Sequence, residues 1–346
     1  METKKWDVDK LEELSPDHPH IVEASKLLKR NEIVAFPTET VYGLGANALS
    51  DDAVNKIFEA KGRPSDNPLI VHIANSEQLN ELVEELPFVA HQLVEHFWPG
   101  PLTLVLTKKA SRLSNKVTPG LKTVALRMPD HPVALALLRA SKLPLAAPSA
   151  NLSGRPSPTT AMHVVADLDG RIAGVINGGA TGVGLESTVI DCTANVPVIL
   201  RPGGVTKEQI EAVVGEVYYD QALNEAGYVP KSPGMKYTHY APSAPLQIVD
   251  GSRHFLQTII TNAQREGKKV GVLTTSENSD FYDADVVAVC GSRKKLATVA
   301  NQLYKVLRSF DERHVDIIYS ESFPSEGVGQ AIMNRLLKAA GYVVIK

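Results

Sequence analysis

Residues 33–73 read IVAFPTETVYGLGANALSDDAVNKIFEAKGRPSDNPLIVHI. The apolar run from Ile33 to Phe36 predicts a buried strand that enters a turn rich in hydroxyl groups and glycines. A helix is expected to begin after Ser50, a typical N-cap residue, and to end at Gly62, which suits the position after a helix. Leu69 to Ile73 predicts a second buried strand. The segment therefore indicates a strand, a polar turn, a helix and another strand in one α/β unit.

Cations recur at the ends of the predicted elements or beside Pro and Gly: Lys61, Arg63, Arg127, Arg155 and Arg201. Any one of them has an ordinary explanation, such as Lys61 compensating the negative end of a helix. Arg127 is less ordinary, because it shares a predicted strand face with Thr123 and Ala125. Burying a lone charge costs several kcal/mol or so, so this arginine needs an anion or a full set of hydrogen bonds. Together the cations predict an anion site, with a nucleotide as its ligand.

Small polar residues follow the predicted strand Leu143 to Ala147, and they include Ser149 and Asn151. Such turns bind ligands in open sheets, which favours contacts to phosphate or ribose. A nucleophilic serine is the alternative for Ser149, but the G-x-S-x-G motif is missing. The glycines of 178–184 form either a phosphate loop without the Walker lysine or a plain connection. His72 is either a structural histidine within its strand or a ligand contact.

The composition bounds the class of protein. The chain has 346 residues, of which 43% are hydrophobic and 22% charged, so it is long enough for two globular domains. Its net charge of −3 argues against a surface that grips nucleic acid or an anionic membrane throughout. The N-terminus shows no secretory signal, and no apolar run is long enough for a membrane span. Cys192 and Cys290 lie far apart, which suits a reducing cytoplasm better than a disulfide framework or a zinc site.

The pattern of elements predicts two α/β domains. Residues 1–220 mix strands and helices without strict alternation, so a mixed sheet is expected. Residues 246–346 alternate strand and helix and predict a smaller, mostly parallel, Rossmann-like sheet. Residues 221–245 lie between them and contain SPGMKYTHYAP (232–242). This aromatic and cationic linker is either interdomain packing or a lid that closes over the first domain.

Eight motifs in order resemble the threonylcarbamoyl-AMP synthase family, whose catalytic unit is the YrdC-type domain. They are AFPTETVYGL (35–44), KGRPSDNPL (61–69), WPGPLT (98–103), APSAN (147–151), RPSPT (155–159), EST (186–188), LRPG (200–203) and PGMKYTHYAP (233–242). The last motif and the C-terminal domain resemble the long form of the family. No site position departs from the family's pattern.

The resemblance implies a fold and a reaction. The fold is an open, twisted mixed sheet with a concave, positively charged cavity. The reaction joins L-threonine, bicarbonate and ATP into L-threonylcarbamoyladenylate, with release of pyrophosphate. The product serves threonylcarbamoyladenosine formation in tRNA by a downstream threonylcarbamoyl transferase machinery. Mg²⁺ is expected to arrive on the nucleotide phosphates, without dedicated protein ligands.

The resemblance also assigns roles to residues, with Lys61 and Arg63 as the catalytic cations. The threonine contacts that it implies are Thr40, His72, Arg127, Ala147 and Ser187. The ATP contacts that it implies are Arg63, Asn67, Thr123, Ser149, Asn151, Ser157, Arg201 and Tyr237. Because two anions must meet, the protein's main task would be to neutralise and align them.

Two other functions remain as alternatives. An RNA-binding module could use a concave basic sheet, although the acidic net charge and the lack of aromatic RNA motifs disfavour it. A carbamoyltransferase is the other alternative, because a related domain occurs in hydrogenase-maturation proteins. That reading expects carbamoyl phosphate as the substrate and zinc-finger cysteines, which the sequence lacks.

Overall fold

A computed structural model of the chain describes residues 2–8, 14–110, 112–223 and 239–346. The described residues fall into two compact units. The first is drawn from residues 1–153, 158–182 and 186–236, and the second from 154–157, 183–185 and 237–346. The boundary predicted at 221–245 falls near this division, but most of that linker, Tyr237 included, lies outside the described residues. Two short loops that lie between stretches of the first unit, 154–157 and 183–185, therefore belong to the second unit.

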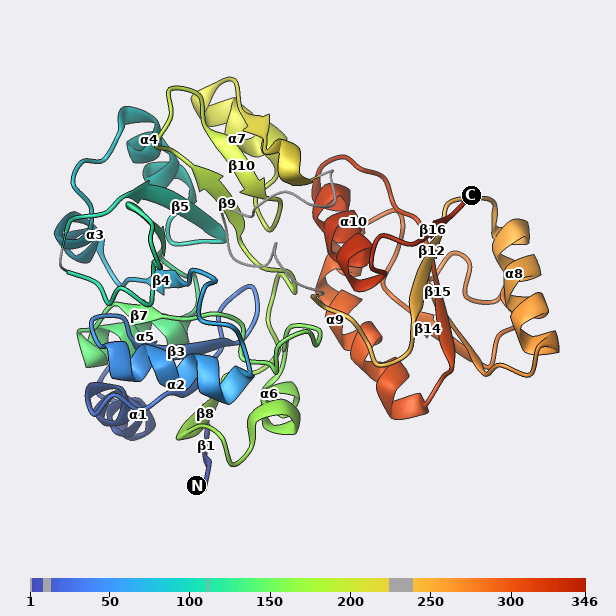
Figure 1. Cartoon of the computed structure of the whole chain (residues 1–346), viewed down its shortest axis with the longest axis horizontal. Helices are drawn as coiled ribbons and strands as arrows, with labels where there is room; N and C mark the ends of the chain where they lie inside the picture. The colour runs from blue at the N-terminus through green and yellow to red at the C-terminus, as the bar shows by residue number, and fades with distance from the viewer. Residues whose placement is uncertain (1, 9–13, 111, 224–238) are drawn as a thin grey trace. The chain divides into compact units, whose positions relative to one another are not determined.

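Within the described residues, the first unit contains a mixed sheet of eleven strands in the order β1-β8-β2-β3-β7-β4-β6-β5-β9-β10-β11 (Figure 1). The strands are β1 (Lys4–Asp7), β2 (Val34–Phe36), β3 (Gly43–Asn47), β4 (Ile70–His72), β5 (Leu102–Thr107), β6 (Thr123–Arg127), β7 (Leu145–Ala146), β8 (Gly174–Asn177), β9 (Thr188–Asp191), β10 (Val198–Arg201) and β11 (Tyr218–Tyr219). Parallel and antiparallel pairs alternate irregularly along it, as the sequence predicts.

The helices of this unit are α1 (Pro19–Lys29), α2 (Asp51–Lys61), α3 (Ser76–Leu82), α4 (Phe88–Phe97), α5 (Pro132–Ser141), α6 (Ala161–Leu168) and α7 (Lys207–Val214), with the short 3-10 turn η1 (Gln221–Leu223). The caps of α2 are those expected. The Ser50 side chain accepts a hydrogen bond from the Ala53 amide, and Gly62 ends the helix in the left-handed conformation with φ 60°.

The two faces of the sheet are covered differently. Alternate strand residues such as Ala35, Val71 and Leu126 join the main core, together with buried residues of α2, α4, α6 and α7. On the opposite face, Phe36 and Leu145 pack against α1 and α5. Further along that second face lies a small cluster made of strand residues: Ile70, Val105, Ala125, Val189 and Leu200. The second face therefore has a helix-covered part and a part whose apolar cluster contains no helix residue.

Three elements are absent from the sequence-based prediction. The edge strand β1 pairs with β8 in a part of the sequence that has little apolar pattern. The strand β3 pairs with β2 where the glycines and hydroxyl groups predict only a turn. The helix α6 follows the proline-rich segment at 154–158. For the two strands, the neighbouring strands supply what the local sequence signal lacks. The helix α6 has local signals of its own, namely the N-cap Thr160 and the buried residues Ala161, Val164 and Leu168.

The second unit contains a wholly parallel sheet in the order β14-β13-β15-β12-β16. Its strands are β12 (Leu246–Val249), β13 (Val270–Thr274), β14 (Val286–Val289), β15 (Ile317–Glu321) and β16 (Val344–Ile345), and its helices are α8 (Arg253–Arg265), α9 (Leu296–Arg313) and α10 (Val328–Ala339). In α9 the residues Ala300, Leu303, Leu307 and Phe310 are buried at helical spacing, whereas Leu296 at the first position is only half-buried. The small α/β domain expected from the sequence is thus present.

Candidate functional site

Polar residues flank the small apolar cluster on the second face of the first unit's sheet. His72 and Arg127 stand two residues beyond Ile70 and Ala125 on the paired strands β4 and β6, and they are register partners. Thr123 lies at the other end of β6, four positions before Arg127, which is about 13 Å along the strand. This face of the sheet therefore has a polar end at Thr123 and another at His72 and Arg127, and the distance between them is similar to the length of a small ligand.

Arg127 is the centre of the first end, and its side chain is buried. Its Nη1 donates to Thr40 Oγ1 at 2.9 Å, and its Nε donates to the Gly100 carbonyl oxygen at 3.2 Å. Its Nη2 lies 2.6 Å from Glu39 Oε2 as an ion pair. Thr40 is held in turn, because its hydroxyl lies 2.8 Å from that of Thr38. The turn after β2 and the end of β6 are thus joined through one guanidinium.

Glu39 was not singled out by the sequence reasoning. Its side chain is only 13% exposed, yet neither carboxylate oxygen has a hydrogen-bond partner within the described residues. Its ion pair with Arg127 links segments 88 residues apart in sequence, so periodicity could not reveal it. The one signal available was the acidic residue between two threonines in the turn PTET.

His72 is buried beside Arg127 and packs its ring edge-on against Phe36, with the ring centroids 6.3 Å apart. Burial, reinforced by the neighbouring Arg127 charge, lowers the pKa of His72 to about 3. The imidazole is therefore neutral at physiological pH. Its Nδ1 is buried and makes no hydrogen bond within the described residues.

Ser187 and Arg201 form a second buried group next to β5. The Ser187 and Thr103 hydroxyls lie 2.7 Å apart. Arg201 Nη2 donates to the Ser187 carbonyl oxygen at 2.9 Å and to its hydroxyl at 3.2 Å. Gly203 allows this close packing, since a Cβ there would lie 2.3 Å from the Glu186 carbonyl oxygen. Thr103 is a second residue that the sequence reasoning missed.

Lys61 joins the end of α2 to the turn after β7. Its Nζ donates to the carbonyl oxygens of Ser149 and Asn151, at 2.5 and 2.6 Å. The Lys61 carbonyl oxygen accepts from the Ser153 amide at 2.9 Å. Lys61, which the resemblance implies as a catalytic cation, therefore lies beside Ser149 and Asn151, two of the implied ATP contacts. In this geometry its ammonium group fixes the turn that carries them.

The other predicted residues are distributed as follows. Arg63 Nη2 donates to the Pro68 carbonyl oxygen at 3.3 Å, and Asn67 is buried with no hydrogen-bond partner for Nδ2 among the described residues. Ala147 is buried, and its amide donates to the Ile70 carbonyl oxygen at 2.9 Å. Ser157 is buried and groups with the second unit. Arg155, one of the five cations, is exposed in the same short loop.

The glycine segment at 178–184 is anchored to the first unit by one tyrosine. The Tyr42 hydroxyl donates to the Gly179 carbonyl oxygen at 2.7 Å and accepts from the Gly178 amide at 3.3 Å. The Gly178 amide, a donor that a phosphate loop would present to its ligand, is therefore occupied. These contacts favour the plain connection between the two readings of this segment.

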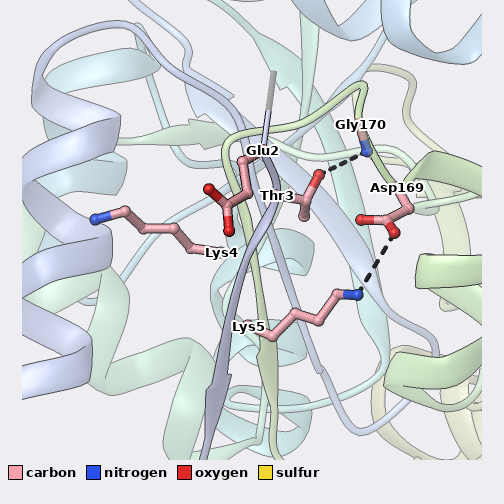
Figure 2. A pocket seen from close by; sticks show the side chains of 6 residues that line it. All are labelled: Glu2, Thr3, Lys4, Lys5, Asp169 and Gly170. Carbon is pink, nitrogen blue, oxygen red and sulfur yellow. Dashed lines mark hydrogen bonds and ion pairs between the residues drawn. The ribbon is translucent and has the colours of Figure 1, made fainter.

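The pocket in Figure 2 is separate from these residues. It has a volume of about 520 Å³ and is lined by Glu2, Thr3, Lys4, Lys5, Asp169 and Gly170. Its polar groups contact one another: the Gly170 amide donates to Thr3 Oγ1 at 2.8 Å, and Lys5 Nζ lies 3.5 Å from Asp169 Oδ2. None of the predicted site residues lines it.

Neither a metal cluster nor a membrane span is found in the part of the chain that the structure describes. Those residues contain no group of three or more His, Cys, Asp or Glu side chains that could hold a metal ion. None of the described helices has the length and apolar content needed to cross a bilayer.

An open mixed sheet with buried arginines, a neutral histidine and hydroxyl groups on one face places the chain among α/β proteins of the YrdC-like class. The fold agrees with the crystal structure of Escherichia coli YciO, at a TM-score of 0.51 and 24% identity over 58% of this chain and 96% of that chain. The family model described as "Telomere recombination" (Sua5, YciO and YrdC) matches residues 26–203. The model described as "Threonylcarbamoyl-AMP synthase, C-terminal domain" matches residues 205–341.

Full-length relatives narrow the class to one family. A threonylcarbamoyl-AMP synthase of Bacillus subtilis is 61% identical over all of both chains, and one of Pyrococcus abyssi is 51% identical over 93% of this chain and 94% of its own. The crystal structure of P. abyssi Sua5 complexed with L-threonine has a TM-score of 0.92 at 47% identity, covering 100% of this chain and 99% of that chain. This chain belongs to the threonylcarbamoyl-AMP synthase family.

Proposed function

We propose that this chain makes L-threonylcarbamoyladenylate from L-threonine, bicarbonate and ATP, and releases pyrophosphate. Membership of the family supports the overall reaction, and a relative 47% identical was crystallised with L-threonine. The observation that carries the proposal at the residue level is the buried group Thr40, His72 and Arg127, which offers one cation, one hydroxyl and one neutral imidazole on an otherwise apolar face.

In this proposal Arg127 binds the α-carboxylate of threonine. A guanidinium has five N–H groups in a planar fork that matches a carboxylate. Two of them are used by Thr40 and Gly100, so three remain around Nη1 and Nη2 for a ligand and for Glu39. His72, Thr40 and Ser187 surround the same end, and Ala147 keeps it narrow. This set suits a small amino acid that carries a hydroxyl group.

ATP binds toward the other end in this proposal. Thr123, Arg63, Asn67 and the Lys61-supported turn at 149–151 supply donors to its phosphates and ribose, with Ser157, Arg201 and Tyr237 as the remaining contacts. The unprotonated threonine nitrogen attacks the carbon of bicarbonate to give a carbamate and water, or attacks CO₂ to give a carbamate and a proton. A carbamate oxygen then attacks the α-phosphorus, and the bond to the pyrophosphate oxygen breaks. The cations stabilise the charge that accumulates on the phosphate oxygens.

Mg²⁺ enters on the nucleotide in this proposal. The site offers mainly cations, hydroxyl groups and amides, and its carboxylate Glu39 is paired with Arg127. Such a set suits an ion that is held mainly by phosphate oxygens. Bound there, the ion would neutralise the pyrophosphate that leaves. We further propose that a tRNA threonylcarbamoyl transferase consumes the product in the cytoplasm.

Pyrophosphate release from ATP tests the reaction. It should require threonine and bicarbonate together, and omission of either should return the rate to background. ATP use that ignores threonine, alongside a salt-sensitive shift of tRNA, would favour the RNA-binding alternative. Turnover that depends on carbamoyl phosphate would favour the carbamoyltransferase alternative.

A further inference from the structure

Glu39 lies where an amino-acid ligand would meet Arg127, and its carboxylate accepts no hydrogen bond from the described residues. It is nearly buried, and neither oxygen has a hydrogen-bond partner within the described residues. Its Oε2 lies 2.6 Å from Arg127 Nη2 as an ion pair, and neither of these two atoms makes a hydrogen bond within the described residues. A buried acceptor without a donor is costly, so this arrangement points to a donor that a ligand brings.

The charges around the carboxylate identify the kind of donor. Arg127 contributes one positive charge and Glu39 one negative charge, while His72 is neutral. The group is balanced before a ligand enters. A carboxylate ligand without an ammonium group would give this buried group a net charge of −1, which is costly where solvation is poor. A zwitterion adds no net charge, because its carboxylate pairs with Arg127 and its ammonium group pairs with Glu39.

We propose that Glu39 receives the α-ammonium group of the amino-acid substrate and thereby selects α-amino acids over the corresponding hydroxy acids. This inference rests on the proposed function and adds a specificity-determining residue to it. Thr38 and Thr40 hold the backbone on both sides, since their hydroxyls bond each other and Thr38 Oγ1 donates to the Val41 carbonyl oxygen at 2.7 Å. The hydrogen bonds within the turn PTET thus fix the backbone that carries the Glu39 carboxylate. Glu39 positions the amine that becomes carboxylated.

The test compares ligands that differ at one group each. The ligands are L-threonine, (2S,3R)-2,3-dihydroxybutanoate, in which a hydroxyl replaces the amine, and L-threoninol, in which a hydroxymethyl replaces the carboxylate. Calorimetry measures the affinity of each ligand for the wild type, Glu39→Gln and Glu39→Asp. Glu81→Gln serves as the matched control, because it removes the same charge from an exposed glutamate of the same unit.

The proposal expects the two variants to behave differently. Glu39→Gln should lower the affinity for threonine by about 10- to 100-fold, which is the range for loss of a charge-assisted hydrogen bond. The same change should leave the affinity for dihydroxybutanoate unchanged or raise it. The ratio of the affinities for threonine and dihydroxybutanoate should therefore fall. Glu39→Asp keeps the charge and should retain part of the preference. Glu81→Gln should match the wild type for all three ligands.

Other outcomes overturn the proposal in distinguishable ways. Equal losses for threonine and dihydroxybutanoate in Glu39→Gln would mean that Glu39 only holds Arg127 in place. The proposal would also be wrong if Glu39→Gln had the same affinities as the wild type, or if the wild type bound none of the ligands. If the ligand preferences follow the prediction but the wild type releases no pyrophosphate, the proposed reaction fails while the ammonium site stands.

Discussion

Arg127 shows how one side chain acquires a role from its surroundings. Its strand is apolar between Thr123 and Arg127, and its guanidinium contacts the turn after β2, the loop before β5 and Glu39. A lysine in its place would keep the charge but lose the planar fork that holds Thr40 and Gly100 while facing a ligand. The geometry of the donors is therefore as important as their charge.

Replacement of Arg127 by lysine should weaken threonine binding by about 10- to 100-fold, because a bidentate, charge-assisted contact is lost. The affinity for ATP measured without threonine should change little, since the predicted nucleotide contacts Arg63, Asn67 and Ser149 lie toward the Thr123 end of the sheet. Calorimetry with each ligand alone measures both effects. Arg139→Lys, an exposed position on α5, is the control and should behave as the wild type. Equal losses for both ligands would contradict separate ends of the site.

His72 makes stability depend on pH. Because its folded pKa is about 3 and its unfolded value is near 6.5, the unfolded chain binds the proton first as the pH falls. The stabilisation is full above pH 6.5 or so and is lost between there and about pH 3, at up to about 1.4 kcal/mol per pH unit. Urea unfolding of the wild type and His72→Asn at pH 7, 6, 5 and 4 measures this slope.

The difference in unfolding free energy between the wild type and His72→Asn should narrow as the pH falls. The exposed residue His96 provides the control, and His96→Asn should follow the wild type throughout. Parallel curves for the wild type and His72→Asn would show that the imidazole is not the group that titrates.

At the scale of elements, the end of α2 and the turn after β7 act as one structure. Sequence signals define each separately: Ser50 and Gly62 bound the helix, and a buried strand precedes the turn. Lys61 joins them through two carbonyl oxygens. A residue expected to act directly on the nucleotide thus also shapes the loop that would contact it.

Lys61→Met should unfold more easily by about 2–4 kcal/mol, because two carbonyl oxygens lose a charged donor. It should also weaken ATP binding, since the turn at 149–151 loses its support. Lys56→Met is the matched control on the same helix, where the lost ion pair with Glu32 is partly exposed and worth at most about 1 kcal/mol. Chemical denaturation and nucleotide titration measure both effects. Lost turnover with unchanged stability and ATP affinity would instead support a purely catalytic role.

At the scale of the whole molecule, the second unit is not a simple C-terminal attachment. Loops 154–157 and 183–185 belong to it by packing. Arg308 Nη2 donates to the Pro156 carbonyl oxygen at 2.5 Å, and the Ala241 amide donates to the Gly154 carbonyl oxygen at 2.9 Å. Gly184 approaches α9 so closely that a Cβ would lie 2.4 Å from Asn301 Cα. The loop that carries Ser157 therefore depends on residues from the end of the chain.

A fragment that ends after Glu216 should remain folded but lose turnover. Its two large cores are formed almost wholly by residues before the cut, so circular dichroism should show a cooperative melt. Loop 154–157 would lose its partners, and pyrophosphate release should fall to background. Addition of residues 237–346 in trans is the control for restoration. Full activity of the fragment alone would show that neither the linker nor the second unit is needed.

The sequence alone determined the class of fold, most element boundaries and the family. Local signals suffice there: caps and glycines end helices, apolar runs predict strands, and the motif residues stand together in short stretches. Only the tertiary structure decided which side chains meet. The pairs of Glu39 with Arg127, Thr103 with Ser187 and Lys61 with the turn at 149–151 span about 84 to 90 residues. Strand pairing and loop packing set such distances, and no local pattern encodes them.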